Sequence, residues 1–195
     1  GYRMPTANGY DVLLGLDGTG YFQATESEAG LVSERLYIAF TYGGEGRFKQ
    51  RYLTRLDPAG AYTAVAASGS YQLLPAQFNE TMGMPERGNE VTVPMWVPYL
   101  PERWGPPQVD GGTVSAFPSV VQSFDNQCAG CHFTGMSLDR TVTGLFQADA
   151  VDDPGGAIDI DGDGSLDEIN IGCERCHGPG SQHVATAGDG PIMNP

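Results

Sequence analysis

The chain has 195 residues and a formal net charge of −14, which arises from 24 acidic side chains and only 10 lysines and arginines. This balance excludes nucleic acid as a partner, because phosphate binding requires clusters of basic side chains. No apolar run approaches the roughly eighteen residues that a membrane-spanning helix needs, so we expect no membrane span in this chain. The 28 glycines and 14 prolines indicate a turn-rich chain of short strands and loops.

The first 105 residues are predicted to be β-rich. Residues 10–16 form an apolar run, and the strong turn sequence Asp-Gly-Thr-Gly follows at residues 17–20. Further strands are predicted over residues 36–42, 47–55, 61–66 and 70–74. In residues 47–55, arginines and a lysine alternate with other side chains, which indicates a strand with one solvent-exposed face.

Residues 75–117 are richer in proline and contain both tryptophans of the chain, Trp96 and Trp104. Each proline removes a backbone donor and fixes φ, so we expect an extended wrap without regular strands or helices. The tryptophans are expected to pack over the β-rich core; stacking on a bound cofactor is the alternative. Together with the strands before it, this wrap forms a predicted scaffold domain over residues 1–117.

The composition changes at residue 118, and a second domain is predicted over residues 118–195. Residues 119–124 indicate a short helix with Ser119 as its N-cap, and this helix leads to Cys128. The following residues, 133–157, are expected to be loop-like.

All four cysteines of the chain fall into two Cys-x-x-Cys-His units. This pattern is the attachment signature of c-type haem, in which both thiols form thioethers with the porphyrin and the next histidine ligates the iron. The units consist of Cys128, Cys131 and His132, and of Cys173, Cys176 and His177. We therefore predict two covalently bound haem c groups. Because bacteria and archaea attach such haems outside the cytoplasm, we expect an exported protein, periplasmic or extracellular.

The main alternative is a four-cysteine zinc site, because zinc ribbons also use paired Cys-x-x-Cys units. Zinc pairs are usually separated by about fifteen to twenty residues, whereas 41 residues separate Cys131 from Cys173. The chain has only 3 histidines, and two of them directly follow the cysteine pairs. Two disulfides are a weaker alternative, because a bridge within Cys-x-x-Cys is strained and redox-active. The pattern thus favours haem.

Two haem irons offer four axial positions, and His132 and His177 fill the two proximal ones. The third histidine, His183, follows His177 after the sharply turned tether Gly178-Pro179-Gly180. That tether is too short for His183 to reach the far face of its own haem, so its expected role is distal ligand of a neighbouring haem. The alternative for His183 is a surface histidine at the start of a helix.

One sixth axial position then has no histidine in this chain. A methionine could supply the ligand, and the candidates are Met82, Met84, Met136 and Met193. A segment outside this sequence or another subunit could also supply it, or the position could stay open. The ligand sets the redox range, and an open position would permit substrate chemistry.

An acidic loop precedes the second haem unit. Its aspartates stand at positions 1, 3 and 5 of a calcium-loop pattern, with Gly164 at position 6. Position 12, where an EF-hand has a bidentate glutamate, is Asn170, so Asp167 and Glu168 are closer substitutes. The calcium candidates are Asp159, Asp161, Asp163, Ser165, Asp167 and Glu168. The ion would fix the segment that leads to the second haem; the alternative is a solvated acidic turn.

These motifs resemble those of multihaem c-type cytochromes related to the tetrahaem cytochrome of nitrifying bacteria. The resemblance rests on Cys-Glu-Arg-Cys-His-Gly-Pro-Gly-Ser-Gln-His at residues 173–183, with Glu168-Ile169 and Gly172 just before it. The first haem unit with Thr134-Gly135 after it, and the stretches 42–44 and 50–53, are also similar to such chains. The resemblance implies electron transfer through closely stacked haems, with His183 ligating a haem other than its own. It also leads us to expect a fragment of a longer polypeptide or a short family member.

The predicted fold is α+β and mainly β, with an N-terminal antiparallel β domain and then a loop-rich haem-binding segment with short helices. The predicted function is electron transfer without catalytic residues, with redox proteins or neighbouring cytochrome subunits as partners. Head-to-tail contacts between copies would also allow a homo-polymer, such as an extracellular cytochrome filament. The alternative function is that of a multihaem oxidoreductase acting on a small nitrogen or sulfur compound at an open haem iron.

Overall fold

The computed structural model describes residues 1–43, 49–56, 69–79, 95–110, 113–115, 122–132, 135–142, 144–156, 158–161 and 163–167. Within these residues the chain is mainly β and its sheets are antiparallel, as predicted. The chain forms two compact units, Gly1–Ser123 and Phe124–Pro195. No helix in the described part of the chain combines the length and the apolar character needed to cross a membrane.

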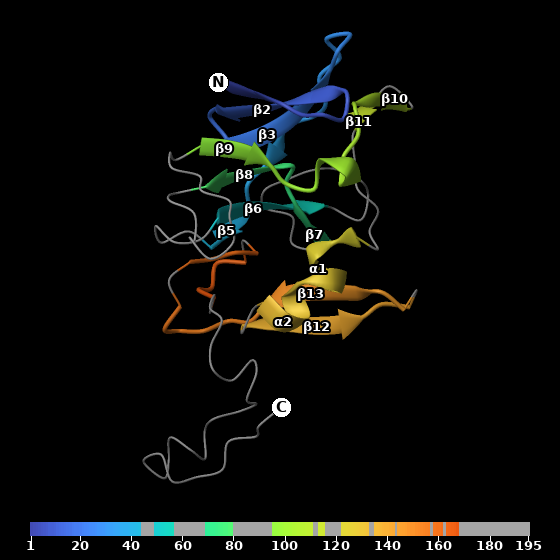
Figure 1. Ribbon diagram of the computed structural model, residues 1–195. Coiled ribbons are helices and arrows are strands. Elements are labelled where there is room, and N and C mark those ends of the chain that lie inside the picture. The colour runs from blue at the N-terminus through green and yellow to red at the C-terminus, as the bar shows by residue number, and fades with distance from the viewer. Residues whose placement is uncertain are drawn as a thin grey trace, which may run out of the picture. The chain divides into compact units, whose positions relative to one another are not determined.

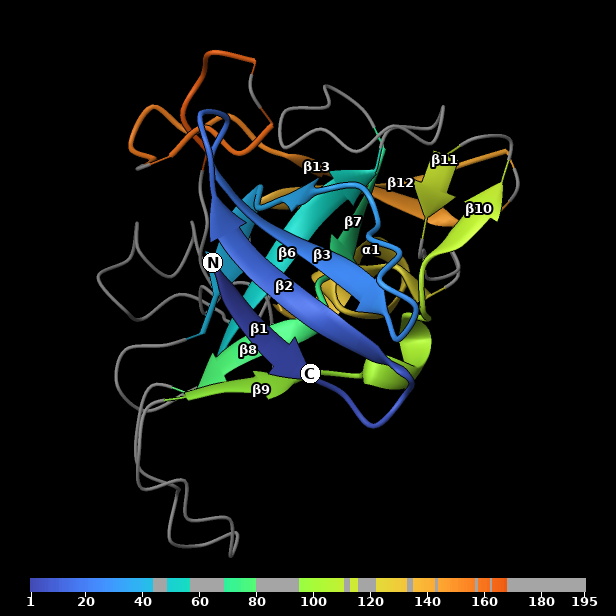
Figure 2. The same cartoon turned by 90° about the horizontal axis from the view of Figure 1, so that it is seen from above.

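The first unit begins with a four-stranded antiparallel sheet in the order β1-β2-β3-β4 (Figure 1, Figure 2). Its strands are β1 (Tyr2–Pro5), β2 (Tyr10–Leu16), β3 (Tyr21–Ser27) and β4 (Leu36–Tyr37). Alternate side chains of β2 are buried, namely Tyr10, Val12 and Leu14, which confirms the strand predicted from the apolar run. The predicted turn is confirmed as well, because the Asp17 N–H donates to the Gly20 carbonyl oxygen at 3.1 Å.

A second sheet of five strands follows in the order β5-β6-β8-β9, with β7 paired to β6. Its strands are β5 (Phe40–Tyr42), β6 (Lys49–Leu56), β7 (Ser70–Leu73), β8 (Ala76–Asn79) and β9 (Met95–Pro98). The strands predicted over residues 47–55 and 70–74 correspond to β6 and β7, and the one predicted over 61–66 lies outside the described residues.

The single strand predicted over residues 36–42 is wrong, because this stretch passes from one sheet to the other. The Ile38 N–H donates to the Tyr21 carbonyl oxygen in the first sheet at 3.0 Å. The next N–H, that of Ala39, donates to the Leu53 carbonyl oxygen in the second sheet at 2.8 Å. The two ends of the stretch therefore belong to β4 and β5, which the apolar pattern alone does not separate.

The two sheets of the first unit share one apolar core. Its buried side chains are Met4, Tyr10, Val12, Leu14, Leu36, Leu74, Ala76 and Trp104. Gln23 on β3 adds a polar link, because its amide accepts from the Ala76 N–H at 3.0 Å and donates to the Ala76 carbonyl oxygen at 3.1 Å. Apolar burial and paired backbone groups thus hold the sheets together.

The proline-rich segment contains regular elements, so the prediction of an extended wrap over residues 75–117 is wrong. It contributes β8, β9, a 3-10 helix (Pro101–Arg103) and a hairpin of β10 (Gln108–Asp110) and β11 (Thr113–Ser115). Pro98 is tolerated in β9 because β9 is an edge strand, where a missing N–H need not interrupt the ladder. The expected packing of Trp104 in the β core is confirmed, and its Nε1 donates to the Leu73 carbonyl oxygen at 3.0 Å.

The prediction that the arginines of β6 lie on a solvent-exposed face is wrong for Arg55. Its side chain is 1% exposed, its guanidinium lies 4.9 Å from the centre of the Tyr71 ring, and Nε donates to the Gly69 carbonyl oxygen. Arg51 is half-buried and lies 4.4 Å from the Tyr99 ring centre. Arg55 is the cross-strand partner of Tyr71 on β7, and both Arg51 and Arg55 stack on aromatic rings, whereas Lys49 at the start of β6 is exposed.

The second unit opens with two short helices, α1 (Phe124–Gln127) and α2 (Ala129–His132). They pack on an antiparallel hairpin of β12 (Met136–Arg140) and β13 (Phe146–Ala150). The loop predicted over residues 133–157 is therefore wrong for both strands. β12 alternates the apolar Met136 and Leu138 with polar side chains, but this run is short and only Met136 is buried, so the local signal for a strand is weak. Residues 119–121 of the helix predicted over 119–124, including its expected N-cap Ser119, lie outside the described residues.

Candidate functional site

The first Cys-x-x-Cys-His unit lies at the junction of α1 and α2. Cys128 directly follows α1, is half-buried, and donates its backbone N–H to the Phe124 carbonyl oxygen at 2.8 Å. The helix α2 then extends to His132, the last residue of the unit. Position 128 therefore directly precedes α2, and position 131 lies within this helix three residues further along the chain.

Two side chains of α1 fasten the helix to β13. Asn126 accepts from the Phe146 N–H at 2.7 Å through Oδ1 and donates to the Phe146 carbonyl oxygen at 3.1 Å through Nδ2. Asp125 is buried, and its Oδ2 accepts from the Ala148 N–H at 3.0 Å. A helix as short as α1 is not stable alone, so these bonds hold the backbone that leads into Cys128.

The amino-acid sequence alone does not mark Asp125 and Asn126 as functional positions. Their partners lie 23 and 20 residues further along the chain. A hydrogen bond across that distance depends on the hairpin, which has no clear local signal. A polar pair two residues before a cysteine motif is a weak signal of a structural role, but it does not reveal the partners of these side chains.

The second Cys-x-x-Cys-His unit, Cys173, Cys176 and His177, lies outside the described residues, and so does His183. The roles predicted for these residues stay predictions. Among the methionine candidates for the sixth axial position, Met136 is buried at the start of β12. The other candidates, Met82, Met84 and Met193, lie outside the described residues.

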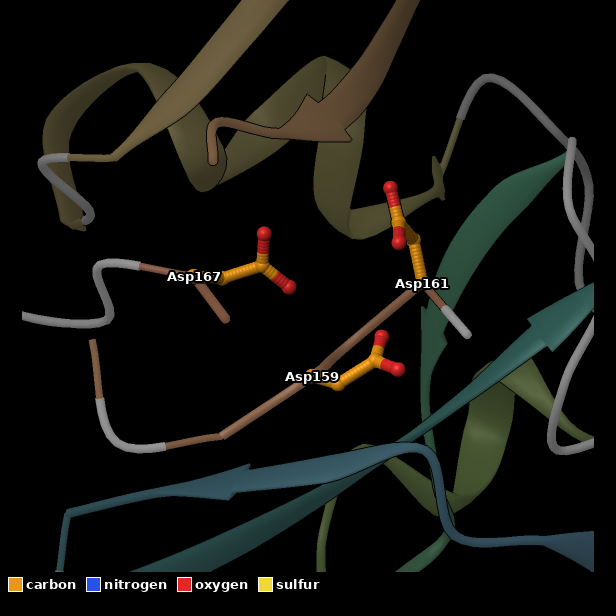
Figure 3. Close-up of side chains that lie close together, drawn as sticks. All are labelled: Asp159, Asp161 and Asp167. Carbon is orange, nitrogen blue, oxygen red and sulfur yellow. The ribbon is translucent and has the colours of Figure 1, made fainter. Parts of the chain in front are cut away.

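Three of the predicted calcium candidates come together in the second unit. One carboxylate oxygen from each of Asp159, Asp161 and Asp167 lies within 4.8 Å of the others (Figure 3). We call these three residues the acidic triad. Two oxygens that bind one calcium ion are at most roughly 5 Å apart, because each Ca–O distance is about 2.4 Å. The triad is therefore compact enough for its three carboxylates to bind the same ion.

Asp167 is the buried member of the triad. Its Oδ2 accepts from the Ile160 N–H at 2.6 Å, whereas its buried Oδ1 has no hydrogen-bond partner in the described part of the chain. Burial raises the pKa of the Asp167 carboxyl; the bond from Ile160 lowers it, and the nearby Asp159, Asp152 and Asp163 raise it. A negative charge at Asp167 thus needs a positive partner, which no described hydrogen bond supplies.

The other loop candidates are placed differently. Asp163 and Ser165 do not belong to the triad, and Asp163 Oδ1 accepts from the Ser165 N–H at 2.7 Å. Asp159 Oδ2 accepts from the N–H of Gly164, whose φ of 97° is a conformation that glycine adopts readily. Glu168 lies outside the described residues. The structure thus brings Asp167 to the loop aspartates and leaves Asp163 bonded to the loop backbone.

The backbone holds Asp167 in place from two sides. Its N–H donates to the Ile158 carbonyl oxygen at 2.7 Å, and it forms β-bridges with Ile158 and Asp152. Gly156 lies directly against it, because a Cβ at position 156 would meet the Asp167 carbonyl oxygen at 2.3 Å. The position of the Asp167 carboxylate therefore depends on a close backbone approach that only a glycine permits.

Comparison of the chain with protein-family models, with curated proteins and with solved structures gives no match. The resemblance to multihaem cytochromes therefore stays an expectation from the motifs. A function has to be argued from the residues themselves, and two groups of residues carry chemistry: the Cys-x-x-Cys-His units and the acidic triad.

Proposed function

We propose that this chain is an exported electron-transfer protein that binds two c-type haems covalently, as part of a multihaem cytochrome. One observation carries the proposal: all four cysteines form Cys-x-x-Cys pairs, and a histidine directly follows each pair. A zinc site or a pair of disulfides would need the cysteines but no histidine at that position. Attachment of haem c needs both residue types in this order.

Each residue of the two units has a defined role in this proposal. The thioethers would form at Cys128, Cys131, Cys173 and Cys176, and the proximal ligands would be His132 and His177. His183 would ligate the iron of a neighbouring haem. Bound haem supplies reversible one-electron chemistry. The chain holds the cofactor, limits its access to water and sets its potential through ligation, burial and charge, so no side chain needs to act as an acid or a base.

The geometry around Cys128 supports a rigid attachment point for the first haem. Asp125 and Asn126 tie α1 to β13, and α2 packs on β12. The backbone on both sides of Cys128 is therefore joined to one hairpin. A cofactor site is held more accurately by regular elements than by a free loop, and electron transfer benefits because the cofactor keeps its position relative to its neighbours.

The proposed partners are redox proteins or further cytochrome subunits outside the cytoplasm. One sixth axial position has no histidine in this chain, so a ligand from another subunit could complete it. Head-to-tail contacts of that kind generate open assemblies, including a homo-polymer. The net charge of −14 favours partners with a basic surface, and association should weaken as salt increases.

Intact-mass spectrometry of the chain, produced in a host that attaches c-type haem, tests this proposal. We expect two haems on the unchanged chain. The Cys128→Ser/Cys131→Ser double variant and the Cys173→Ser/Cys176→Ser double variant should each retain one haem, so each is the control for the other. An alkaline pyridine haemochrome spectrum without a c-type band, together with an unmodified mass, would contradict the proposal.

The same preparation distinguishes an electron carrier from the alternative oxidoreductase. A carrier whose axial positions are filled gives low-spin haem spectra that do not respond to carbon monoxide. A high-spin signal and carbon monoxide binding after reduction would instead favour chemistry on a small nitrogen or sulfur compound at an open iron. Electron transfer alone would then be an incomplete description.

A further inference from the structure

The acidic triad combines geometry with an unpaired buried oxygen. Asp167 is 0% exposed, and its Oδ1 has no hydrogen-bond partner within the described residues. In Figure 3 the Asp167 carboxylate is directed toward the segment that carries Asp159 and Asp161. A buried carboxylate oxygen without a donor is unfavourable unless a cation binds there. The unpaired oxygen is therefore an independent indication of a ligand at the triad.

The surrounding sequence supplies no basic side chain to neutralise these carboxylates. Between Arg140 and Arg175 the chain has no lysine, arginine or histidine. The same interval contains the acidic residues Asp149, Asp152, Asp153, Asp159, Asp161, Asp163, Asp167, Glu168 and Glu174. Converging carboxylates repel one another, so a bound cation would relieve both the repulsion and the missing bond at Asp167.

We propose that Asp159, Asp161 and Asp167 bind one calcium ion, with Asp167 as the ligand that closes the loop. The donors are carboxylate oxygens, which favour hard cations over the softer transition metals. Calcium accepts six to eight oxygens in flexible geometry, whereas magnesium demands a near-ideal octahedron and retains several waters. A loop with three converging carboxylates fits calcium better. Backbone carbonyl oxygens and water complete the coordination.

This site differs from an EF-hand in its closing ligand. In an EF-hand, a glutamate at position 12 closes the loop and position 5 supplies a side-chain ligand. Here the residue at position 9, Asp167, is buried against the loop, and Asp163 at position 5 accepts from the Ser165 N–H. The loop is therefore shorter than an EF-hand loop, and five residues separate its last ligand from Cys173. The bound ion fixes the start of the segment that carries the second Cys-x-x-Cys-His unit.

The site is independent of haem, because its ligands are carboxylates of the loop. Calcium binding can therefore be measured on the full chain whether or not haem is attached, and its result does not decide the proposed electron-transfer function. Isothermal titration calorimetry, with calcium chloride added to the chelator-treated full chain, tests the calcium site directly. We expect one saturable site with a Kd between about 10⁻⁶ and 10⁻³ M, and much weaker binding of magnesium.

Isosteric variants identify the ligands. Asp159→Asn, at an exposed position where folding is not at risk, should weaken calcium binding by about tenfold or more, and so should Asp167→Asn. Asp163→Asn should have a clearly smaller effect. Asp139→Asn, which removes an exposed charge on β12, should change the affinity by less than about twofold. This order follows from the triad and not from the acidity of the loop as a whole.

Three results would overturn the proposal. The first is the absence of saturable binding up to about 10 mM calcium, which lies above the weakest range of such sites. The second is weak binding to several sites that Asp139→Asn reduces as much as Asp159→Asn, which would indicate an adventitious ion only. The third is an Asp163→Asn variant that loses as much affinity as Asp159→Asn, because the ligand set would then follow the EF-hand pattern.

Discussion

Truncation of Asp125 tests how the first Cys-x-x-Cys-His unit is held in place. Asp125 is 2% exposed, and its Oδ2 accepts from the N–H of Ala148, which is also fully buried. Asp125→Ala leaves that N–H without its acceptor in a place that water does not reach. A hydrogen bond to a charged group contributes about 1.5–3 kcal/mol, so we expect the second unit to lose about 2–3 kcal/mol of stability.

Asn126→Ala is the matched control, because it removes two hydrogen bonds of the same helix. Its partner Phe146 is 41% exposed, so water can replace both bonds, and we expect a loss of only about 1 kcal/mol. The variant that loses the bond to a buried N–H should therefore be the less stable one. Burial of the partner group decides this order.

Amide hydrogen exchange followed by mass spectrometry measures the effect within the second unit. A loss of 2–3 kcal/mol corresponds to exchange about 30- to 150-fold faster over α1 and β12, compared with about fivefold for Asn126→Ala. The amides of β2 and β3 in the first unit serve as the internal reference and should be unchanged. Exchange in Asp125→Ala that is no faster than in Asn126→Ala would refute the reasoning.

Three further predictions concern other contacts. Gln23→Leu approximately preserves side-chain size but removes both hydrogen bonds to the Ala76 backbone, so urea unfolding should show a loss of stability of about 2–4 kcal/mol. The control Gln50→Leu, at a half-buried position, should lose less than about 1 kcal/mol. Equal losses in the two variants would show that the Gln23–Ala76 hydrogen bonds do not stabilise the packing of the two sheets. Tyr10 donates to the Pro101 carbonyl oxygen at 2.7 Å, and burial, with a contribution from Glu102, raises the pKa of its hydroxyl. In the unfolded chain the Tyr10 hydroxyl ionises near pH 10. Its contribution to the stability of the fold is therefore complete below about pH 10 and decreases above it. Tyr10→Phe should therefore be less stable than the unchanged chain at pH 8 by about 1 kcal/mol, and the difference should shrink at pH 11; a constant difference in thermal unfolding would contradict this. Gly156→Ala would place a Cβ 2.3 Å from the Asp167 carbonyl oxygen and should weaken calcium binding. In the control Gly155→Ala the new Cβ has its nearest contact at 3.4 Å, so this variant should bind calcium like the unchanged chain. Equal calcium affinities of the two variants would show that Gly156 does not position Asp167.

The strands that the sequence predicts well are those with one buried face. β2 alternates buried and half-exposed side chains and ends in a turn with a clear residue signature, so both could be read locally. β12 has mostly exposed or half-buried side chains, and its pairing with β13 is visible only in three dimensions. β9 was missed because prolines argue against a strand, an argument that does not apply at the edge of a sheet.

Side-chain environment was less predictable than strand position. The charge of Arg55 indicated solvent exposure, but the side chain is buried over the ring of Tyr71, its cross-strand partner on β7. The spacing of Asp159, Asp161 and Asp163 predicted that their carboxylates converge, but the structure brings together only those of Asp159 and Asp161 and leaves Asp163 outside the triad. The burial of Asp167 beside them depends on the β-bridges to Asp152 and Ile158, which no local pattern encodes. Local spacing therefore identifies candidate ligands, and the fold selects among them.

The central claim is that the two Cys-x-x-Cys-His units bind haem and not zinc. Intact mass combined with metal analysis of the unchanged chain tests it most directly, because both quantities are counted per chain. We predict two covalently attached haems and two iron atoms. An unmodified polypeptide mass with one bound zinc ion would contradict the account, since four cysteine thiolates would then form a single tetrahedral site.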